Sequence, residues 1–184
     1  MDILLIIRKK TFLLILMTLV FAGCGYTTHS VMPSGEHTLY VDNFVNEIDV
    51  TREITNQNVY YPYRPGMEAN ITRQVINRFI LDGNYEIMEM KSAYFELSGQ
   101  LVDFKREPLR YDANEYVIEY RLSVVVNMEF KDLKKGEIVW AEDNFAGEST
   151  YRTTGQFAKS EDKAAGDAII DLARRIVERA VENW

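Results

Sequence analysis

The sequence predicts an α+β fold in which two helices pack on one face of a mostly antiparallel four-stranded sheet. Three observations support this fold class. Apolar residues recur at helical spacing in two segments, 67–81 and 160–184, and alternate with polar residues in long segments between them. The elements follow in the order strand, helix, three or more strands, helix. Helices that cover the apolar face of an antiparallel sheet form an α+β sandwich.

The N-terminal segment is typical of a bacterial lipoprotein signal peptide. The basic residues 8–10 precede an apolar run of about eleven residues, 11–21, and a bilayer-spanning helix needs about twenty. The run ends in "VFAGC", which resembles a lipobox, and Cys24 is the only cysteine of the chain. We therefore predict cleavage before Cys24 and lipid attachment to it. The alternative is an ordinary signal peptide followed by a free or buried thiol.

This interpretation divides the chain into a signal peptide (1–23), a lipid tether (24–37) and a single domain (38–184) that is large enough for one core. By the sorting rule of enterobacterial lipoproteins, Gly25 in place of aspartate favours the outer membrane, with the domain on the periplasmic side. Removal of one acidic and three basic residues with the signal peptide changes the net charge from -7 to -9. An acidic total argues against nucleic acid as a partner.

The first half of the domain is expected to contain strands and one helix. Residues 38–44 alternate apolar and polar side chains, as a half-buried strand does. The polar segment 45–64 is expected to be a long loop, either a mobile binding loop or partly structured. Pro65 and Gly66 precede an amphipathic helix over 67–81, which "DGNY" ends, and a short strand is expected at 85–88.

The sequence of the second half predicts consecutive antiparallel strands followed by a C-terminal helix. A strand is expected at 93–104, and the segment 115–130, "EYVIEYRLSVVVNMEF", alternates along its length. One face of that strand should lie in the core and the other in water. The tight connection "KDLKKGE" predicts that the next strand, 137–149, pairs antiparallel with it. Ser160 is expected to begin the C-terminal helix.

No catalytic or metal-binding pattern is present in the sequence. Both histidines, His29 and His37, lie in the predicted tether, so a histidine-based nucleophilic mechanism is not expected. The HExxH, CxxC and glycine-rich phosphate-binding patterns are absent, and we expect neither a metal ion nor a cofactor. With 28 acidic residues, carboxylate pairs arise by chance. We interpret the protein as a non-enzyme, with a paired-carboxylate enzyme acting on envelope sugars as an alternative.

A basic segment stands out in this acidic chain. Residues 104–116, "FKREPLRYDANEY", place Lys105, Arg106 and Arg110 at the predicted turn between two long strands. Positive charge at a loop tip can bind a phosphate or a phosphorylated sugar. The same side chains could instead pair with neighbouring acidic residues and only keep the turn soluble.

The lipobox with "CGYTT", the strand "TLYVDNFVN", the helix "MEANITRQVINRFILDG" and the segments "PLRYDANEYVIEYRLSV" and "GEIVW" together resemble the LptE family of lipopolysaccharide-assembly lipoproteins. The resemblance covers nearly all of the mature chain. It implies a lipid-anchored outer-membrane protein that plugs the β-barrel partner LptD, assists the assembly of that barrel and contacts lipopolysaccharide during delivery to the outer leaflet.

The resemblance also implies two sets of site residues. Candidates for contact with the anionic groups of lipopolysaccharide are Lys105, Arg106 and Arg110. Candidates for contact with the barrel wall are the polar residues of the alternating strand, Glu119, Arg121, Ser123 and Asn127. The sequence leaves a competing function open. A tethered α+β lipoprotein can also activate a peptidoglycan synthase or pilot a secretin.

Overall fold

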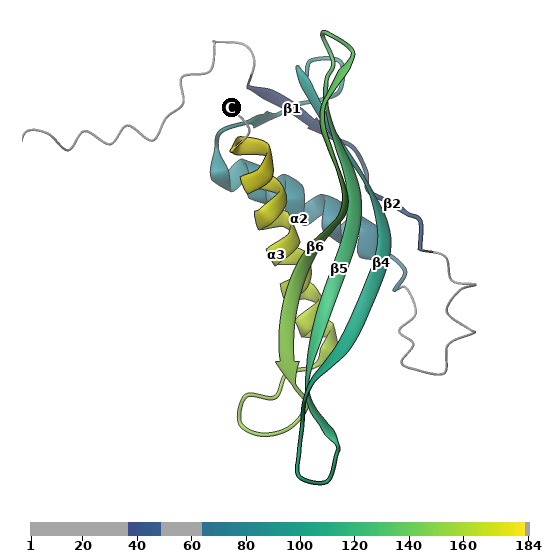
Figure 1. The fold of residues 1–184 in the computed structure, drawn as a ribbon. Coiled ribbons are helices and arrows are strands. Elements are labelled where there is room, and N and C mark those ends of the chain that lie inside the picture. Colours follow the sequence, from purple (N-terminus) through teal and green to yellow (C-terminus); the bar gives the residue numbers. More distant parts are fainter. Residues whose placement is uncertain (1–36, 49–63, 183–184) are drawn as a thin grey trace, which may run out of the picture. The chain divides into compact units, whose positions relative to one another are not determined.

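The computed structural model describes residues 37–48 and 64–182 (Figure 1). The predicted signal peptide, Cys24, the rest of the tether before His37, and residues 49–63 of the predicted loop lie outside this part. The elements are β1 (Thr38–Val41), β2 (Val45–Asn46), α2 (Met67–Asp82), β3 (Glu86–Ile87), β4 (Phe95–Tyr111), β5 (Val117–Asp132), β6 (Glu137–Arg152) and α3 (Glu161–Val181). Neither described helix is long and apolar enough to cross a membrane.

The strands form one mixed sheet in the order β3-β1-β4-β5-β6, and β2 also pairs with β4. The prediction of an α+β fold with two helices is confirmed, but the four mostly antiparallel strands are wrong. The sheet has six strands, and β1 is parallel to both β3 and β4, as β2 is to β4. The reason is the connection through α2, because a helical crossover returns the chain in the direction needed for parallel pairing.

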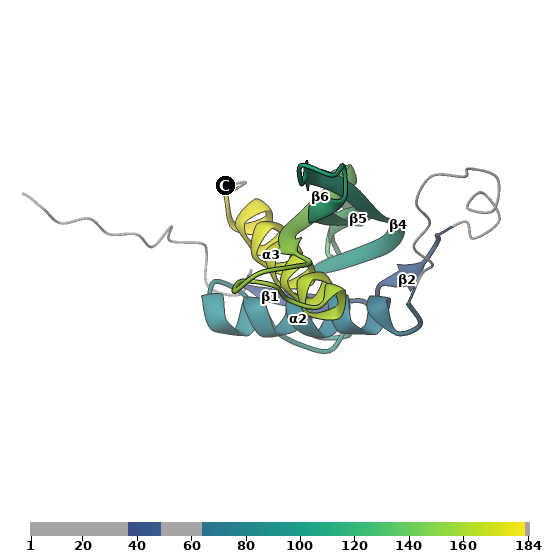
Figure 2. The same cartoon turned by 90° about the horizontal axis from the view of Figure 1, so that it is seen from below.

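The two hairpins β4–β5 and β5–β6 are antiparallel, which confirms the predicted pairing of the segment 137–149. Both helices lie on the same side of these strands (Figures 1 and 2). Alternate residues of β5 are buried on this helix-covered side: Leu122, Val124, Val126, Met128 and Phe130. We call the opposite side of β4, β5 and β6, which no described helix covers, the helix-free face.

Two glycines of the sheet allow close packing in the core, one against α3 and one against Phe44. Gly147 of β6 faces α3, and a methyl group built there would overlap the backbone nitrogen of Leu172 and the carbonyl oxygen of Ala168. At Gly99 of β4, the ring of Phe44 occupies the space that a side chain would need. Both glycines are therefore sites of close approach in the core rather than turns.

Aromatic rings fill the core between α2 and the strands. Phe130 of β5 stacks on Phe95 of β4 and on Trp140 of β6, with ring centroids 5.0 Å and 5.2 Å away. Tyr85 meets Phe130 edge-on at 5.9 Å and also contacts Phe79 of α2. This cluster joins three strands to the C-terminal end of α2.

The turn between β4 and β5 is shorter than predicted. Pairing with β5 continues beyond Phe104 to Tyr111, so the turn occupies only the residues between Tyr111 and Val117. The carboxylate of Asp112 closes it by accepting the backbone N–H groups of Asn114 and Tyr116, at 2.8 Å and 2.9 Å. The basic segment 104–116 is therefore mostly strand. The prediction that Lys105, Arg106 and Arg110 lie at the tip of a turn is wrong.

Candidate functional site

The four residues proposed for barrel contact lie together on the helix-free face of β5. They alternate with the buried residues of the helix-covered side, as the period of two in a strand requires. Glu119 pairs with Arg110 of β4 at 3.3 Å and with Arg152 of β6 at 3.8 Å. The pattern of alternation thus placed these residues on one face, and neighbouring strands add partners that are distant in sequence.

Further along the face, Arg121 pairs with Glu148 of β6 at 3.7 Å, and the Ser123 hydroxyl donates to the same carboxylate at 3.5 Å. The side-chain oxygen of Asn127 accepts the backbone N–H of Asn144 at 2.9 Å. Ser123 is only 7% exposed, so a large partner can reach it only past its neighbours. The side chain of Arg121 is 40% exposed and is open to a partner.

The three residues proposed for ligand contact are divided between the two sides of the sheet. Lys105 lies opposite Ser123, and Arg110 lies opposite Glu119, so both are on the helix-free face. Their side chains are 52% and 58% exposed. Arg106 lies opposite Leu122 on the helix-covered side, with a side chain only 17% exposed. A register shift between Pro108 and Arg110 explains why two even-numbered arginines face opposite ways.

Arg106 belongs to an ion-pair cluster at the start of α3. Its guanidinium donates to Glu161 at 2.8 Å and lies 4.3 Å from the centre of the Tyr120 ring. Glu161 also accepts from Arg64 at 2.6 Å and from the hydroxyl of Tyr151 at 3.0 Å. Burial raises the pKa of Tyr151, as does its hydrogen bond to Glu161, so the phenol stays protonated and remains a donor.

We expect Arg106→Ala to lower the free energy of unfolding by about 2 kcal/mol, because it removes a charge-assisted hydrogen bond and a cation–π contact that are both largely shielded from water. Urea denaturation measures the change. The matched control is Lys105→Ala, whose exposed pair with Asp103 should contribute less than about 0.5 kcal/mol. Equal effects of the two substitutions would contradict a structural role for Arg106.

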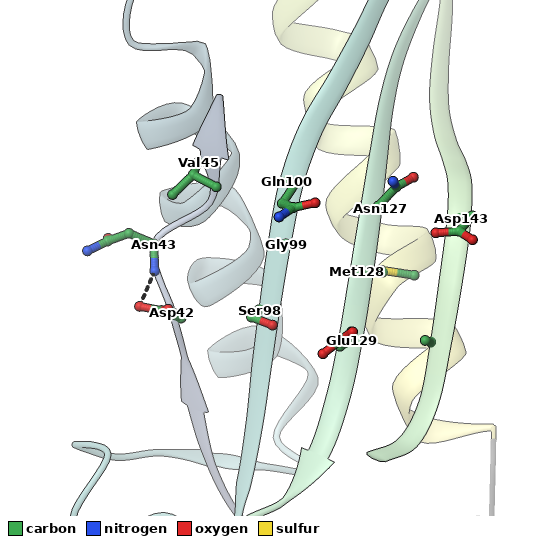
Figure 3. Close-up of a pocket in the computed structure, with 11 residues that line it drawn as sticks. Asp42, Asn43, Val45, Ser98, Gly99, Gln100, Asn127, Met128, Glu129 and Asp143 are labelled. Carbon is green, nitrogen blue, oxygen red and sulfur yellow. Dashed lines mark hydrogen bonds between the residues drawn. The ribbon is translucent and has the colours of Figure 1, made fainter. Parts of the chain in front are cut away.

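The helix-free face also contains a hollow that the sequence analysis did not identify (Figure 3). It has a volume of about 350 Å³ and is lined by Asp42, Asn43 and Val45, in and before β2, and by the strands β4, β5 and β6. Ser98 and Gln100 come from β4, and Asn127 and Glu129 come from β5. Four separate segments build this hollow, so no local pattern in the sequence could have revealed it.

The hollow is polar and acidic. Asp42, Glu129 and Asp143 line it, and none of them forms an ion pair with another residue of the described part. The hydroxyl of Tyr40 donates to Asp42 at 3.1 Å. This hydrogen bond and the negative charge of Asp42 both raise the pKa of Tyr40. Within residues 37–48 and 64–182, no group of histidine, cysteine or acidic residues is arranged to hold a metal ion.

Two solved structures show the same fold at low identity, and a third is similar with a lower score. A protein from Xanthomonas campestris superimposes with a TM-score of 0.55 at 9% identity over 84% of this chain and 91% of its own. A hypothetical protein from Chlamydia trachomatis gives 0.50 at 11% identity, with coverage of 79% and 95%. The rare lipoprotein B of Shewanella oneidensis gives 0.47 at 14%, with coverage of 79% and 94%. No curated protein sequence matches this chain.

A profile of the LptE family, described as lipopolysaccharide-assembly, matches residues 37–180. The match extends from the first described residue to the last turn of α3 and so includes the described strands and the two described helices. It contains the helix-free face, the ion-pair cluster and the hollow. This chain is therefore a member of the LptE family of bacterial envelope lipoproteins.

Proposed function

We propose that this protein is an outer-membrane lipoprotein, anchored through Cys24 on the periplasmic side, whose domain plugs an LptD-type β-barrel. In this role it assists assembly of the barrel and helps to deliver lipopolysaccharide to the outer leaflet without catalysing a reaction. The observation that carries the proposal is the family match over residues 37–180, which covers nearly the whole predicted domain.

The helix-free face has properties that suit contact with the inside of a barrel. Strands β4, β5 and β6 contain 17, 16 and 16 residues, so each extends about 50 Å at the usual rise of a strand. The interior of a membrane barrel is polar. The charges of Arg110, Glu119, Arg121, Glu148 and Arg152 already form pairs on this face, so burial against a wall would not leave them uncompensated.

Affinity purification of the tagged full-length protein from detergent-solubilised outer membranes tests the plug role. We expect a large β-barrel protein to co-purify. Arg121→Glu would place a like charge beside Glu148 and present the wrong charge to the wall, so barrel recovery should fall about tenfold. The matched control is Arg73→Glu on an exposed side of α2, which should leave recovery unchanged. Recovery of a peptidoglycan synthase or a secretin in place of a barrel would refute the proposal.

Lipopolysaccharide contact is tested separately. The double variant Lys105→Glu/Arg110→Glu reverses two exposed charges of the helix-free face and should weaken lipopolysaccharide binding about tenfold. The control is Arg73→Glu/Lys163→Glu, which changes the net charge by the same amount but at exposed positions of α2 and α3. It should bind lipopolysaccharide as the unmodified protein does. An equal loss in both double variants would show that only total charge matters and would remove this site.

A further inference from the structure

An open apolar groove lies at the edge of the sheet that β3 forms. Its volume is about 540 Å³, and β1, α2 and the segment after β3 build it. Most of its lining is apolar and consists of Tyr40, Val41, Ile76, Ile87 and Met88. Neither the predicted site residues nor the acidic hollow belongs to this groove.

Several apolar side chains in and next to the groove are exposed to solvent. Ile80 follows Ile76 by one helical turn, so it projects from the same side of α2, and it is 61% exposed. Met88 is 37% exposed and Met90 is 51% exposed. We call Ile76, Ile80, Ile87, Met88 and Met90 the apolar edge. Several neighbouring apolar side chains of this kind mark a contact surface more often than isolated exposed ones do.

The apolar edge lies where the chain enters the domain. The carbonyl oxygen of His37 accepts the backbone N–H of Glu86 at 2.6 Å, so the first described residue is fixed against β3. Cys24 precedes His37 by thirteen residues. A chain of thirteen residues spans at most about 45 Å, even when fully extended. An acyl anchor on Cys24 would therefore hold the first strand, and this edge beside it, within about 45 Å of a lipid surface.

The apolar edge is also remote from the tip of the β4–β5 hairpin. β1 pairs with Phe95–Leu97 at the beginning of β4, and the turn after Tyr111 lies at the other end of that strand (Figure 1). The two ends of β4 are about 50 Å apart at the usual rise per residue. Contact of the apolar edge with lipid therefore leaves the hairpin free to extend away from the anchor.

We infer that the apolar edge inserts shallowly into the phospholipid leaflet beside the anchor and orients the domain there. This inference rests on the anchorage at Cys24 in the proposed function. Side chains such as Ile80 and Met90 would enter the boundary between headgroups and acyl chains. Glu89 and Lys91 flank Met90 with opposite charges, so the attraction is apolar and should depend little on salt.

The test uses the mature full-length chain with Cys24→Ala, which lacks acyl chains, and sedimentation with vesicles of phosphatidylethanolamine and phosphatidylglycerol. We expect measurable binding that is unchanged between low and high salt. Ile80→Glu should weaken it at least tenfold, because a carboxylate must then enter the apolar boundary. Because Ile80 is exposed, the Ile80→Glu variant should unfold at the same urea concentration as the parent chain. A lower midpoint would reveal a folding defect.

The matched control is Ile170→Glu, since Ile170 lies on α3 and is 56% exposed. It should bind vesicles as the parent chain does. The inference is overturned if the parent chain does not bind, if both substitutions weaken binding equally, or if sedimentation velocity shows a dimer that Ile80→Glu dissociates. The vesicles contain no barrel protein, so failure here leaves the plug role standing, and failure of barrel co-purification leaves this result standing.

Discussion

Replacement of Gly147 by alanine is expected to lower the free energy of unfolding by about 3 kcal/mol, at the upper end for overpacked cores. The added methyl group would overlap the backbone of α3 at Ala168 and Leu172. Backbone atoms cannot rotate away as a side chain can, so the helix itself must shift from the sheet. Urea denaturation followed by circular dichroism measures the loss.

The same substitution elsewhere provides the control. Gly166 lies within α3, and a methyl group built there meets no atom within 4 Å. Gly166→Ala should therefore stabilise the domain, by up to about 1 kcal/mol, because alanine is the better helix former. A Gly147→Ala variant as stable as the parent would show that α3 does not pack on β6 as closely as the structure indicates.

Phe130→Ala is expected to have the largest effect among the core residues, about 4 kcal/mol. Its ring is 1% exposed and contacts Phe95, Trp140 and Tyr85, which come from three different segments. Truncation leaves a cavity that three other rings cannot fill without losing their own contacts. The loss should appear both in the urea midpoint and in the near-ultraviolet circular dichroism of the remaining rings.

Tyr116→Ala removes an aromatic ring of similar size from the same hairpin. Tyr116 is 71% exposed at the end of the β4–β5 turn, so its loss should change stability by less than about 0.5 kcal/mol. Similar losses in the two variants would mean that the aromatic cluster does not form the core of the sheet.

The sequence predicted the elements whose signal is local. Regular alternation identified β5, and helical spacing identified α2 and α3 to within a few residues. Strands were expected near β1 and β3, but their parallel pairing was missed because it is not local: Leu39 lies beside Phe95, and Val45 lies beside Gln100. β2 contains only two residues, which is too short for a pattern, so it was assigned to the loop.

In the candidate site, too, features with a local sequence signal were predicted and features that depend on strand pairing were not. Alternation within one strand correctly grouped the proposed barrel-contact residues on one face. It could have separated Arg106 from Lys105 as well, since Arg106 is two residues from the buried Phe104. The reversal at Arg110 could not have been predicted, because a bulge depends on the register between two strands.

The position of β1 also affects how the domain would respond to mechanical force. β1 is hydrogen-bonded on both sides, to β3 and to β4, although it is the first strand among the described residues. A pull on the N-terminal end would act along β1 and would strain its hydrogen bonds to both neighbours together, in shear. With the anchorage proposed above, β1 would resist being peeled from its sheet when membrane and partner move apart.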